Sequence, residues 1–318
     1  MQQAAFGKTG LTVSVAGLGC GGHSRLGQSY GNTTAQSIAI IHAAMDMGVN
    51  FIDTATAYGT EAIVGEAIKG RRDEVILSTK RIIFQQGTSP VGTDLLSGED
   101  FITGVDDNLK LLGTDCIDVL HLHGVFANQY DHCVRELVPA LHKLREQGKI
   151  RFLGITERFI SDTDHTMLSR ALDDDFWDVV MTGFNMINPS ARRTVLPKTQ
   201  EKNIATLIMF AVRRALSDPT ATAEIIRELA AADLIDTSEL TLDSPFDFLL
   251  APTIASSVTE AAYRFCRHEP GAHVVLTGTG SLDHLKENLD VLQMPPLPTE
   301  AQDKLRKIFG NVDSVSGN

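Results

Sequence analysis

Four polar residues stand at or just beyond the ends of short apolar runs. Asp53 ends the run NFID, Lys80 ends VILSTK, His123 ends DVLHLH, and Tyr58 follows Asp53 by five residues. A free tyrosine titrates near about pH 10, so it is a poor acid at neutrality until a cation lowers its pKa. With Lys80 as that cation, held by Asp53, Tyr58 could protonate a carbonyl oxygen while hydride reaches the carbon. His123 could orient the carbonyl and stabilise the developing alkoxide.

Each of these residues also has an ordinary structural explanation. An aspartate at a strand end often caps the next helix, and a lone lysine there usually extends to solvent. A histidine in an apolar run is more often a core residue, and His121, on the same strand face as His123, is a candidate for that role. The chemical interpretation therefore depends on the four side chains meeting at one place.

The elements that would bring them together are eight short runs rich in Val, Ile and Leu, separated by segments of helical period. The runs are Val15–Gly19, Asn50–Asp53, Val75–Thr79, Ile117–Leu122, Ile150–Ile155, Asp178–Thr182, Ala205–Phe210 and His273–Leu276. This alternation predicts an α/β fold, a (β/α)8 TIM barrel with an N-terminal β-hairpin, as one domain over residues 1–318; the alternative is an open doubly wound sheet. In a barrel, the C-terminal ends of all strands share one mouth, so the four residues would converge there.

Capping residues mark several of the intervening helices. Thr33 with Gln36, Ser257 with Glu260, and Thr299 with Gln302 have the spacing of capping boxes. A further helix is expected at 131–147, where Pro139 predicts either a kink or a later start.

A long stretch, Arg213–Ser256, separates the seventh strand from its return helix. In a barrel this is a long loop after strand 7 on the C-terminal face. It contains one expected helix, Ala221–Leu234. The stretch is either a surface excursion or a cover over a ligand.

Composition narrows the function further. The net charge of −12 over 318 residues argues against nucleic acid as the partner. The four cysteines are scattered without a C-x-x-C pair, which indicates reduced thiols rather than a disulfide frame or zinc site. We see no compact His/Asp cluster for a metal, no signal peptide and no membrane-spanning run, so the expectation is a cytoplasmic protein without a metal or membrane partner.

The segments around these residues resemble the aldo-keto reductases. The resemblance is carried by FGKTGLTVSVAGLGCGG, NFIDTATAYGTEAIVGEAI, ILSTK, IDVLHLHG, GKIRFLGIT and VLTGTGSLDHLKENLDVL, which span nearly the whole chain. It implies that Asp53, Tyr58, Lys80 and His123 form the catalytic tetrad. It also implies a nicotinamide nucleotide lying extended across the C-terminal face of the barrel, without a Rossmann domain.

The glycine-rich segment after the first strand fits that implication. Gly17, Gly19 and Gly22 match G-x-G-x-x-G, but the loop HSRLGQSYGN follows where the dinucleotide fingerprint requires a helix. We expect these glycines to let the backbone turn closely beneath the cofactor. The predicted contacts in this region are Gly19, Cys20 and Gly21, together with Asp53.

The nicotinamide end departs from the family pattern. Thr156 and Glu157 replace the usual Ser-Asn, and Met181 replaces a Gln. Glu157 and Met181 cannot reproduce the donors and acceptors of an amide. Phe210 aligns with the aromatic residue that stacks on the nicotinamide ring. The usual Ser-Pro-Leu after it is replaced, which makes Ala211 and Arg213 the expected contacts, the arginine to the pyrophosphate or simply to solvent.

The adenine end has also lost fixed charge. The positions that hold the 2′-phosphate in many members correspond to Gly278 and His284. Backbone N–H groups near Thr279 and Gly280, at a helix N-terminus, can still hold a phosphate. NADP(H) is therefore favoured and NAD(H) remains possible. Glu287 and Asn288 are expected at the adenine.

The sequence thus predicts an NAD(P)H-dependent oxidoreductase that reduces aldehydes or ketones to alcohols, with Tyr58 as general acid. The alternatives are a sugar or aldose dehydrogenase and, from another class, a cofactor-sensing regulatory subunit. A metal-dependent hydrolase using His121 and His123 ranks far behind. The expected partner is a small carbonyl or alcohol, and the expected assembly is a monomer or small homo-oligomer.

Overall fold

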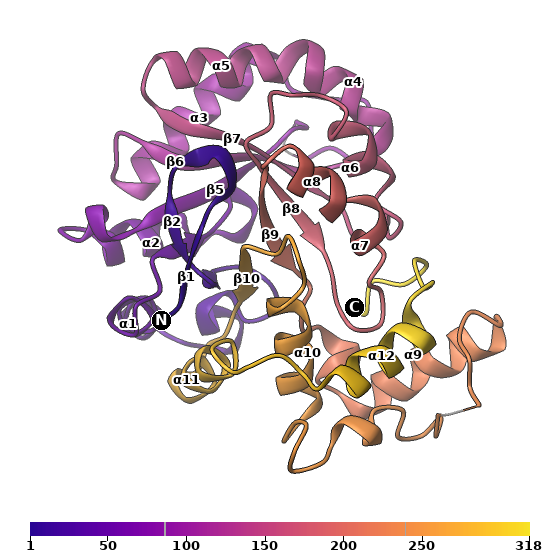
Figure 1. Cartoon of the computed structure of the whole chain (residues 1–318). Coiled ribbons are helices and arrows are strands. Elements are labelled where there is room, and N and C mark those ends of the chain that lie inside the picture. Colours follow the sequence, from indigo (N-terminus) through magenta and orange to yellow (C-terminus); the bar gives the residue numbers. More distant parts are fainter. Residues whose placement is uncertain (86, 239) are drawn as a thin grey trace.

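The computed structural model describes residues 1–85, 87–238 and 240–318. Eight parallel strands close into a barrel in the order β10-β3-β4-β5-β6-β7-β8-β9 (Figure 1). The strands are β3 (Ala16–Gly19), β4 (Phe51–Asp53), β5 (Ile76–Ile82), β6 (Ile117–Val125), β7 (Ile150–Glu157), β8 (Val179–Gly183), β9 (Ala205–Met209) and β10 (Val274–Thr277). The predicted barrel is confirmed, and each strand lies within a few residues of its predicted run.

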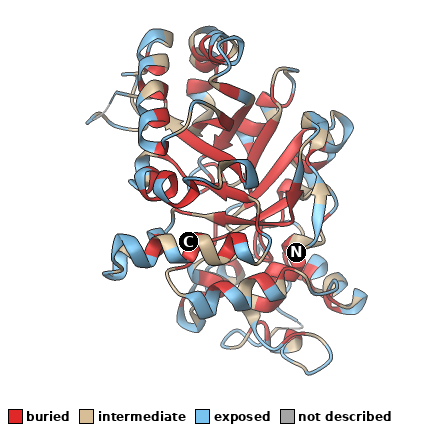
Figure 2. Cartoon of the chain, turned by 90° about the vertical axis from the view of Figure 1, so that its left-hand side faces the viewer, coloured by how far each residue is buried: buried red, intermediate tan, exposed pale blue. Residues whose placement is uncertain are grey.

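Helices lie around the barrel (Figure 1), and most of them bury one face. Figure 2 shows mostly buried residues along the barrel strands, whereas the helices alternate between buried and exposed residues. The helices are α1 (Thr34–Asp46), α2 (Glu61–Ile68), α3 (Gly98–Leu112), α4 (Tyr130–His132), α5 (Val138–Glu146), α6 (Thr166–Ala171), α7 (Ala191–Thr194), α8 (Leu196–Glu201), α9 (Pro219–Ala231), α10 (Val258–Arg267), α11 (Leu282–Val291) and α12 (Thr299–Phe309). Among the described residues, none of these helices combines the length and apolarity needed to cross a bilayer.

The N-terminal hairpin closes the end of the barrel where the strands begin. Its antiparallel strands are β1 (Gln3–Ala5) and β2 (Thr12–Ser14), joined by a short 3₁₀ turn. Phe6, fully buried, packs in one apolar cluster with Phe51, Val119 and Val274 from the barrel strands. Hydrophobic burial therefore seals this end, and the opposite end is left for the residues of interest.

Pro139 is accommodated by a local change of helix type. A π-helical turn, Cys133–Leu137, precedes α5, and Pro139 falls in the first turn of α5. Proline lacks an N–H, and the first turn of a helix needs no N–H partner, so the position is tolerated there. The helix therefore restarts before the proline.

The capping boxes have mixed outcomes. Thr33 and Gln36 form the full reciprocal box at the start of α1. Ser257 accepts from the backbone of Glu260, but the Glu260 carboxylate bonds to Ser256 instead of closing the box. The box expected at Thr299 is wrong: that residue is already the first of α12, so its hydroxyl cannot take the capping position.

The stretch after β9 forms the expected helix as α9, capped by Asp218, whose carboxylate accepts from two backbone N–H groups. Glu239, in the same stretch, and Gln86, in the segment after Lys80, lie outside the described residues. Both ends of the stretch, near Ser217 and Ser256, line the cleft described below.

Candidate active site

A buried ion pair lies at the centre of the barrel mouth. The Nζ atom of Lys80 donates to Oδ2 of Asp53 at 2.5 Å and to the backbone oxygen of Thr54 at 2.9 Å. The hydroxyl of Ser78 donates to the other carboxylate oxygen at 2.9 Å. Burial would lower the pKa of Lys80, but the charge of Asp53 and the hydrogen bond to it oppose this and the pKa is raised. The lysine therefore stays charged, as a buried ion pair with satisfied hydrogen bonds requires.

Tyr58 is held beside this ammonium group by a 3₁₀ turn, Thr56–Tyr58, that follows β4 directly. The Nζ atom of Lys80 lies 4.9 Å from the centroid of the Tyr58 ring. The ring also lies against Gly21, where a Cβ atom would come within 2.4 Å of ring carbon Cε2. Only glycine at position 21 leaves room for the ring.

His123 completes this group, which we call the Tyr58 cluster (Asp53, Tyr58, Lys80 and His123). Its ring meets the Tyr58 ring edge to face, with 5.6 Å between centroids. Burial, together with the charges of Lys80 and Arg158, lowers the pKa of His123 to about 3. The imidazole is therefore neutral at physiological pH. Its Nδ1 atom is buried without a partner among the described residues, which leaves Nε2 as the ring nitrogen that a bound molecule can reach.

His121, by contrast, is fully buried on β6 and does not line the cleft. Its two ring nitrogens have no hydrogen-bond partner among the described residues. Burial, with the charge of Lys80, lowers its pKa well below the usual value. It is a neutral core residue, as one of the two interpretations anticipated.

A cleft of about 1930 Å³ opens over the Tyr58 cluster and runs to α11. Of the residues expected to contact a cofactor, those lining the cleft are Gly19, Gly21, Asp53, Thr156, Glu157, Met181, Phe210, Ala211, Arg213, Gly278, Thr279, Gly280, His284, Glu287 and Asn288. Segments far apart in the sequence thus share one surface because each follows the C-terminal end of a barrel strand.

Cys20 is the exception among the expected contacts. Its side chain is fully buried and does not line the cleft. Its backbone N–H donates to Asp53 at 2.8 Å, and its carbonyl accepts from the hydroxyl of Thr60 at 3.1 Å. Cys20 therefore ties the end of β3 to the segment that carries Tyr58, and its expected contact with a cofactor is corrected to this supporting position.

At the end of β7, the side chains of Thr156 and Glu157 are bonded within the protein. The Thr156 hydroxyl accepts from the backbone of Gly124 at 2.7 Å. The Glu157 carboxylate is fully buried against His165, and no sequence pattern indicates this contact because seven residues of loop separate the two. Met181, on the neighbouring strand, is 2% exposed.

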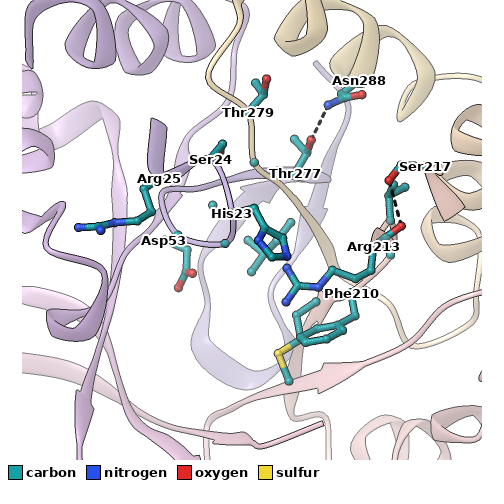
Figure 3. A pocket seen from close by; sticks show the side chains of 18 of the residues that line it. His23, Ser24, Arg25, Asp53, Phe210, Arg213, Ser217, Thr277, Thr279 and Asn288 are labelled. Atoms are coloured by element: carbon teal, nitrogen blue, oxygen red, sulfur yellow. Dashed lines mark hydrogen bonds between the residues drawn. The ribbon is translucent and has the colours of Figure 1, made fainter. Parts of the chain in front are cut away.

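Phe210 and Arg213 form the wall of the cleft beyond β9 (Figure 3). Phe210 follows the strand instead of ending it, and adopts a left-handed conformation with φ of 66°. The guanidinium of Arg213 lies 4.0 Å from the Phe210 ring centroid, in the favourable range for a cation–π contact. No ion pair to Arg213 occurs within the described chain, and its Nε atom is buried without a partner.

The far end of the cleft is built on the N-terminus of α11. Ser281 caps the helix, and Thr279 accepts from the Ser281 backbone at 3.1 Å. Asn288 donates to the Thr277 hydroxyl at 2.9 Å, which fixes its orientation (Figure 3). A Cβ atom on Gly280 would lie 2.5 Å from Cα of Gly27, so the two chain segments touch through bare backbone.

No Rossmann helix follows the Gly17–Gly22 segment, since α1 begins only at Thr34.

These features fit an extended dinucleotide. The helix N-terminus can hold phosphate at one end, and Arg213 is a half-buried cation with no counter-ion among the described residues. Phe210 presents an aromatic ring to the same cleft that Tyr58 lines. The loop after β3 adds His23, Ser24 and Arg25, residues that no sequence signal had indicated. Arg25 donates from Nε to the backbone oxygen of Tyr58 at 2.7 Å. The described residues contain no group of three or more potential metal ligands.

Comparison with known proteins gives concordant results. An L-galactose dehydrogenase of Arabidopsis thaliana is 35% identical over 159 residues, which cover 48% of this chain and 47% of that protein. The fold matches an aldo-keto reductase from Bacillus halodurans in its holo form, with a TM-score of 0.72, 23% identity and coverage of 99% and 98%. An aldo/keto reductase from Klebsiella pneumoniae in complex with NADP and acetate matches with a TM-score of 0.68, 22% identity and coverage of 98% and 97%.

The family assignment follows from a match over most of the chain. The model of the aldo/keto reductase family matches residues 18–309, which include all eight barrel strands except the first two residues of β3. The chain therefore belongs to the aldo/keto reductase family of oxidoreductases.

Proposed function

We propose that this protein is an NAD(P)H-dependent reductase of small aldehydes or ketones in which Tyr58 is the general acid. The observation that carries the proposal is the Lys80 ammonium, held at 2.5 Å by Asp53 and at 4.9 Å from the Tyr58 ring. The same cluster serves the reverse reaction, since the acid that protonates a carbonyl oxygen is the base that deprotonates the alcohol.

Each residue of the cluster has a distinct part. A bound nicotinamide supplies hydride to the carbonyl carbon. Tyr58 donates its proton to the oxygen, and the nearby Lys80 ammonium stabilises the negative charge left on the phenol. Asp53 keeps Lys80 in place and charged. Neutral His123 donates a hydrogen bond to the substrate oxygen, which orients the carbonyl toward Tyr58.

For the cofactor we favour NADP(H), with NAD(H) as the alternative. The Klebsiella relative was solved with NADP, and the N-terminus of α11 supplies backbone N–H groups for a phosphate. His284 is the side chain of the cleft nearest this terminus in sequence that can add a positive charge. The compartment that suits four free cysteines is the cytoplasm.

A second candidate, an aldose dehydrogenase working in the oxidative direction, is favoured by the similarity to the plant L-galactose dehydrogenase. Both candidates use the same cluster, so direction and substrate must be measured. Initial rates with NADPH and a panel of aldehydes and ketones, and with NADP⁺ or NAD⁺ and a panel of aldoses, compare the two. Turnover that disappears in Tyr58→Phe supports the proposal. The absence of turnover in both panels, with nucleotide bound, would favour a cofactor-sensing role instead.

Cofactor preference is tested separately by fluorescence titration with NADPH and NADH. Preferential NADPH binding that falls in His284→Ala supports a phosphate held by His284. Equal binding of both nucleotides would indicate dual specificity, and binding of neither would overturn the proposed function.

A further inference from the structure

A buried acid–base pair lies behind the wall of the cleft and has no part in the proton transfer described above. The Glu157 carboxylate accepts from Nδ1 of His165 at 2.9 Å, and both side chains are fully buried. The same carboxylate accepts from the Thr182 hydroxyl at 3.0 Å and from the backbone of Gly183 at 2.7 Å. All three donors to the Glu157 carboxylate thus belong to the protein: one lies on the loop before α6 and two on β8.

Several features of this pair are expected to lower the stability of the fold. His165 adopts a left-handed backbone conformation with φ of 64°, which non-glycine residues rarely occupy. Its Nε2 atom is buried without a partner among the described residues. Replacing a buried ion pair by apolar side chains is often neutral or stabilising. Strain, an unsatisfied nitrogen and a buried charge at one residue point to a role beyond stability.

The charge state of the pair is set by its neighbours. Burial would lower the pKa of His165, but the charge and hydrogen bond of Glu157 oppose this and the pKa is raised. Asp162 and Asp164, on the loop before α6, act in the same direction. The raised pKa favours the protonated form of His165 beside Glu157, and a hydrogen bond between an imidazolium and a carboxylate is stronger than a neutral one.

Aromatic contacts connect the pair to the cleft. The His165 ring stacks on Phe159 with 5.2 Å between centroids and 15° between planes. Phe159 in turn meets Phe210 edge to face at 5.4 Å and 80°. A Cβ atom on Gly183 would lie 2.1 Å from the Phe159 ring, so this strand end has glycine where the ring sits. Phe159 and Phe210 both line the cleft.

We infer that Glu157 and His165 are positioning residues for the nicotinamide ring: their bond fixes the His165 ring, which holds Phe159 and Phe210 in place. This inference rests on the proposed function. It explains how the site can work although Met181 offers no amide, and although the polar groups of Thr156 and Glu157 already bond within the protein. Orientation of the ring then comes from a rigid aromatic wall more than from side-chain hydrogen bonds.

Two variants of His165 separate its bond from its stack. In His165→Asn, the side-chain amide can still donate to Glu157, and asparagine tolerates the left-handed backbone, but the ring on Phe159 is lost. In His165→Phe the stacked ring is kept and the bond to Glu157 is lost. Phe159→Leu removes the next ring directly, and serves if either His165 variant does not fold.

The measurement is a pair of dissociation constants, for NADP⁺ and for 2′-phospho-ADP-ribose, which lacks the nicotinamide. We expect His165→Asn and Phe159→Leu to weaken NADP⁺ binding about tenfold, by analogy with the loss of an aromatic pair, and to leave the fragment within about twofold. His165→Phe should fall between wild type and these variants, because the ring remains but is no longer tethered.

Other outcomes overturn the inference in distinguishable ways. If both ligands keep their affinity in His165→Asn and Phe159→Leu, the pair serves stability alone. If both ligands lose affinity equally, the substitutions distort the whole cleft and a specific effect on the nicotinamide is excluded. If the wild-type protein binds neither ligand, the proposed function itself fails, and that result is seen before any variant is made.

Discussion

Arg213, at one end of the barrel, differs in its partners from Arg72 and Arg151 at the other end. Where the strands begin, the Asp118 carboxylate bonds to Arg72 at 2.8 Å and to Arg151 at 2.6 Å, and it also accepts from the backbone of Leu77. Where the strands end, Arg213 has no ion pair within the described chain and rests on an aromatic ring. Both ends have cavities, of about 640 Å³ and 1930 Å³.

The difference lies in what remains unsatisfied. At the first end a buried carboxylate bonds to both arginines, and Phe6 packs between the barrel strands, so few polar groups are left to recognise a ligand. At the second end, Arg213 lacks a counter-ion and Nδ1 of His123 lacks a partner among the described residues. Phe210 and His165 there also have left-handed backbones. A left-handed residue, Asn203, also occurs just before β9 at the first end, so the unpaired polar groups carry the distinction and favour the second end as the one that binds a ligand.

The largest expected effect is on catalysis at the end of the barrel that carries the cleft. Replacing Tyr58 with Phe removes the proposed acid and leaves the ring packed on Gly21. We expect kcat to fall about 10³-fold, within the usual range for general acid catalysis. Initial rates at saturating nucleotide measure it. The melting temperature and nucleotide affinity should match wild type; substantial residual turnover would show that another group protonates the substrate.

Asp118→Asn tests the first end. Loss of the carboxylate leaves Arg72 and Arg151 without their common partner, and we expect the free energy of unfolding to fall by about 2 kcal/mol. Urea denaturation measures it. The kcat of the folded variant should equal that of wild type, because the cleft lies at the other end. A fall in kcat with unchanged stability would contradict the proposed division between the two ends.

Arg213→Leu should have the opposite effects to Asp118→Asn: nucleotide affinity should fall and stability should stay nearly unchanged. Since Arg213 forms no ion pair with the described residues, the free energy of unfolding should stay within about 0.5 kcal/mol of wild type. Nucleotide affinity should fall about tenfold, or about 1.4 kcal/mol, through loss of a charge-assisted contact to phosphate. Titration of the variant beside Arg213→Lys measures this, with the lysine variant partly restored. Wild-type affinity in Arg213→Leu would mean that the guanidinium only shields Phe210.

The smallest effect concerns pH. His123 has a pKa of about 3 in the folded protein, against about 6.5 in an unfolded chain. Between these two pKa values the unfolded state binds more protons than the folded state. The free energy of unfolding is therefore unaffected by the titration of His123 above about pH 6.5 and falls as pH decreases from there toward 3. We expect a slope below about 1.4 kcal/mol per pH unit, since the imidazole is only half-buried. Urea denaturation at several pH values should show a shallower dependence of the unfolding free energy on pH in His123→Gln. Equal slopes in the two proteins would mean that a group other than His123 causes the pH dependence.

Much of the site was predictable because strand ends are easy to find in this sequence. The runs ending at Asp53 and Lys80, and the one containing His123, are apolar and short, and a parallel barrel places such ends together. Other features were not predictable. Phe210 was assigned to the strand because its residue type suits one, whereas the close wall it forms with Phe159 and Arg213 requires a left-handed turn. Thr299 has the residue type of a cap but already lies inside its helix.

The sequence by itself determined the barrel, the family and the residues of the Tyr58 cluster, since these depend on periodicity and on short spacings within single βα units. Only the tertiary structure decided which polar groups satisfy one another. The sequence predicted Glu157 to be a poor replacement for an amide, and in the structure its carboxylate bonds to the buried His165. Cys20 read as a cofactor contact, and the structure buries it. Such pairings depend on the directions of side chains from different strands and loops, which no local pattern encodes.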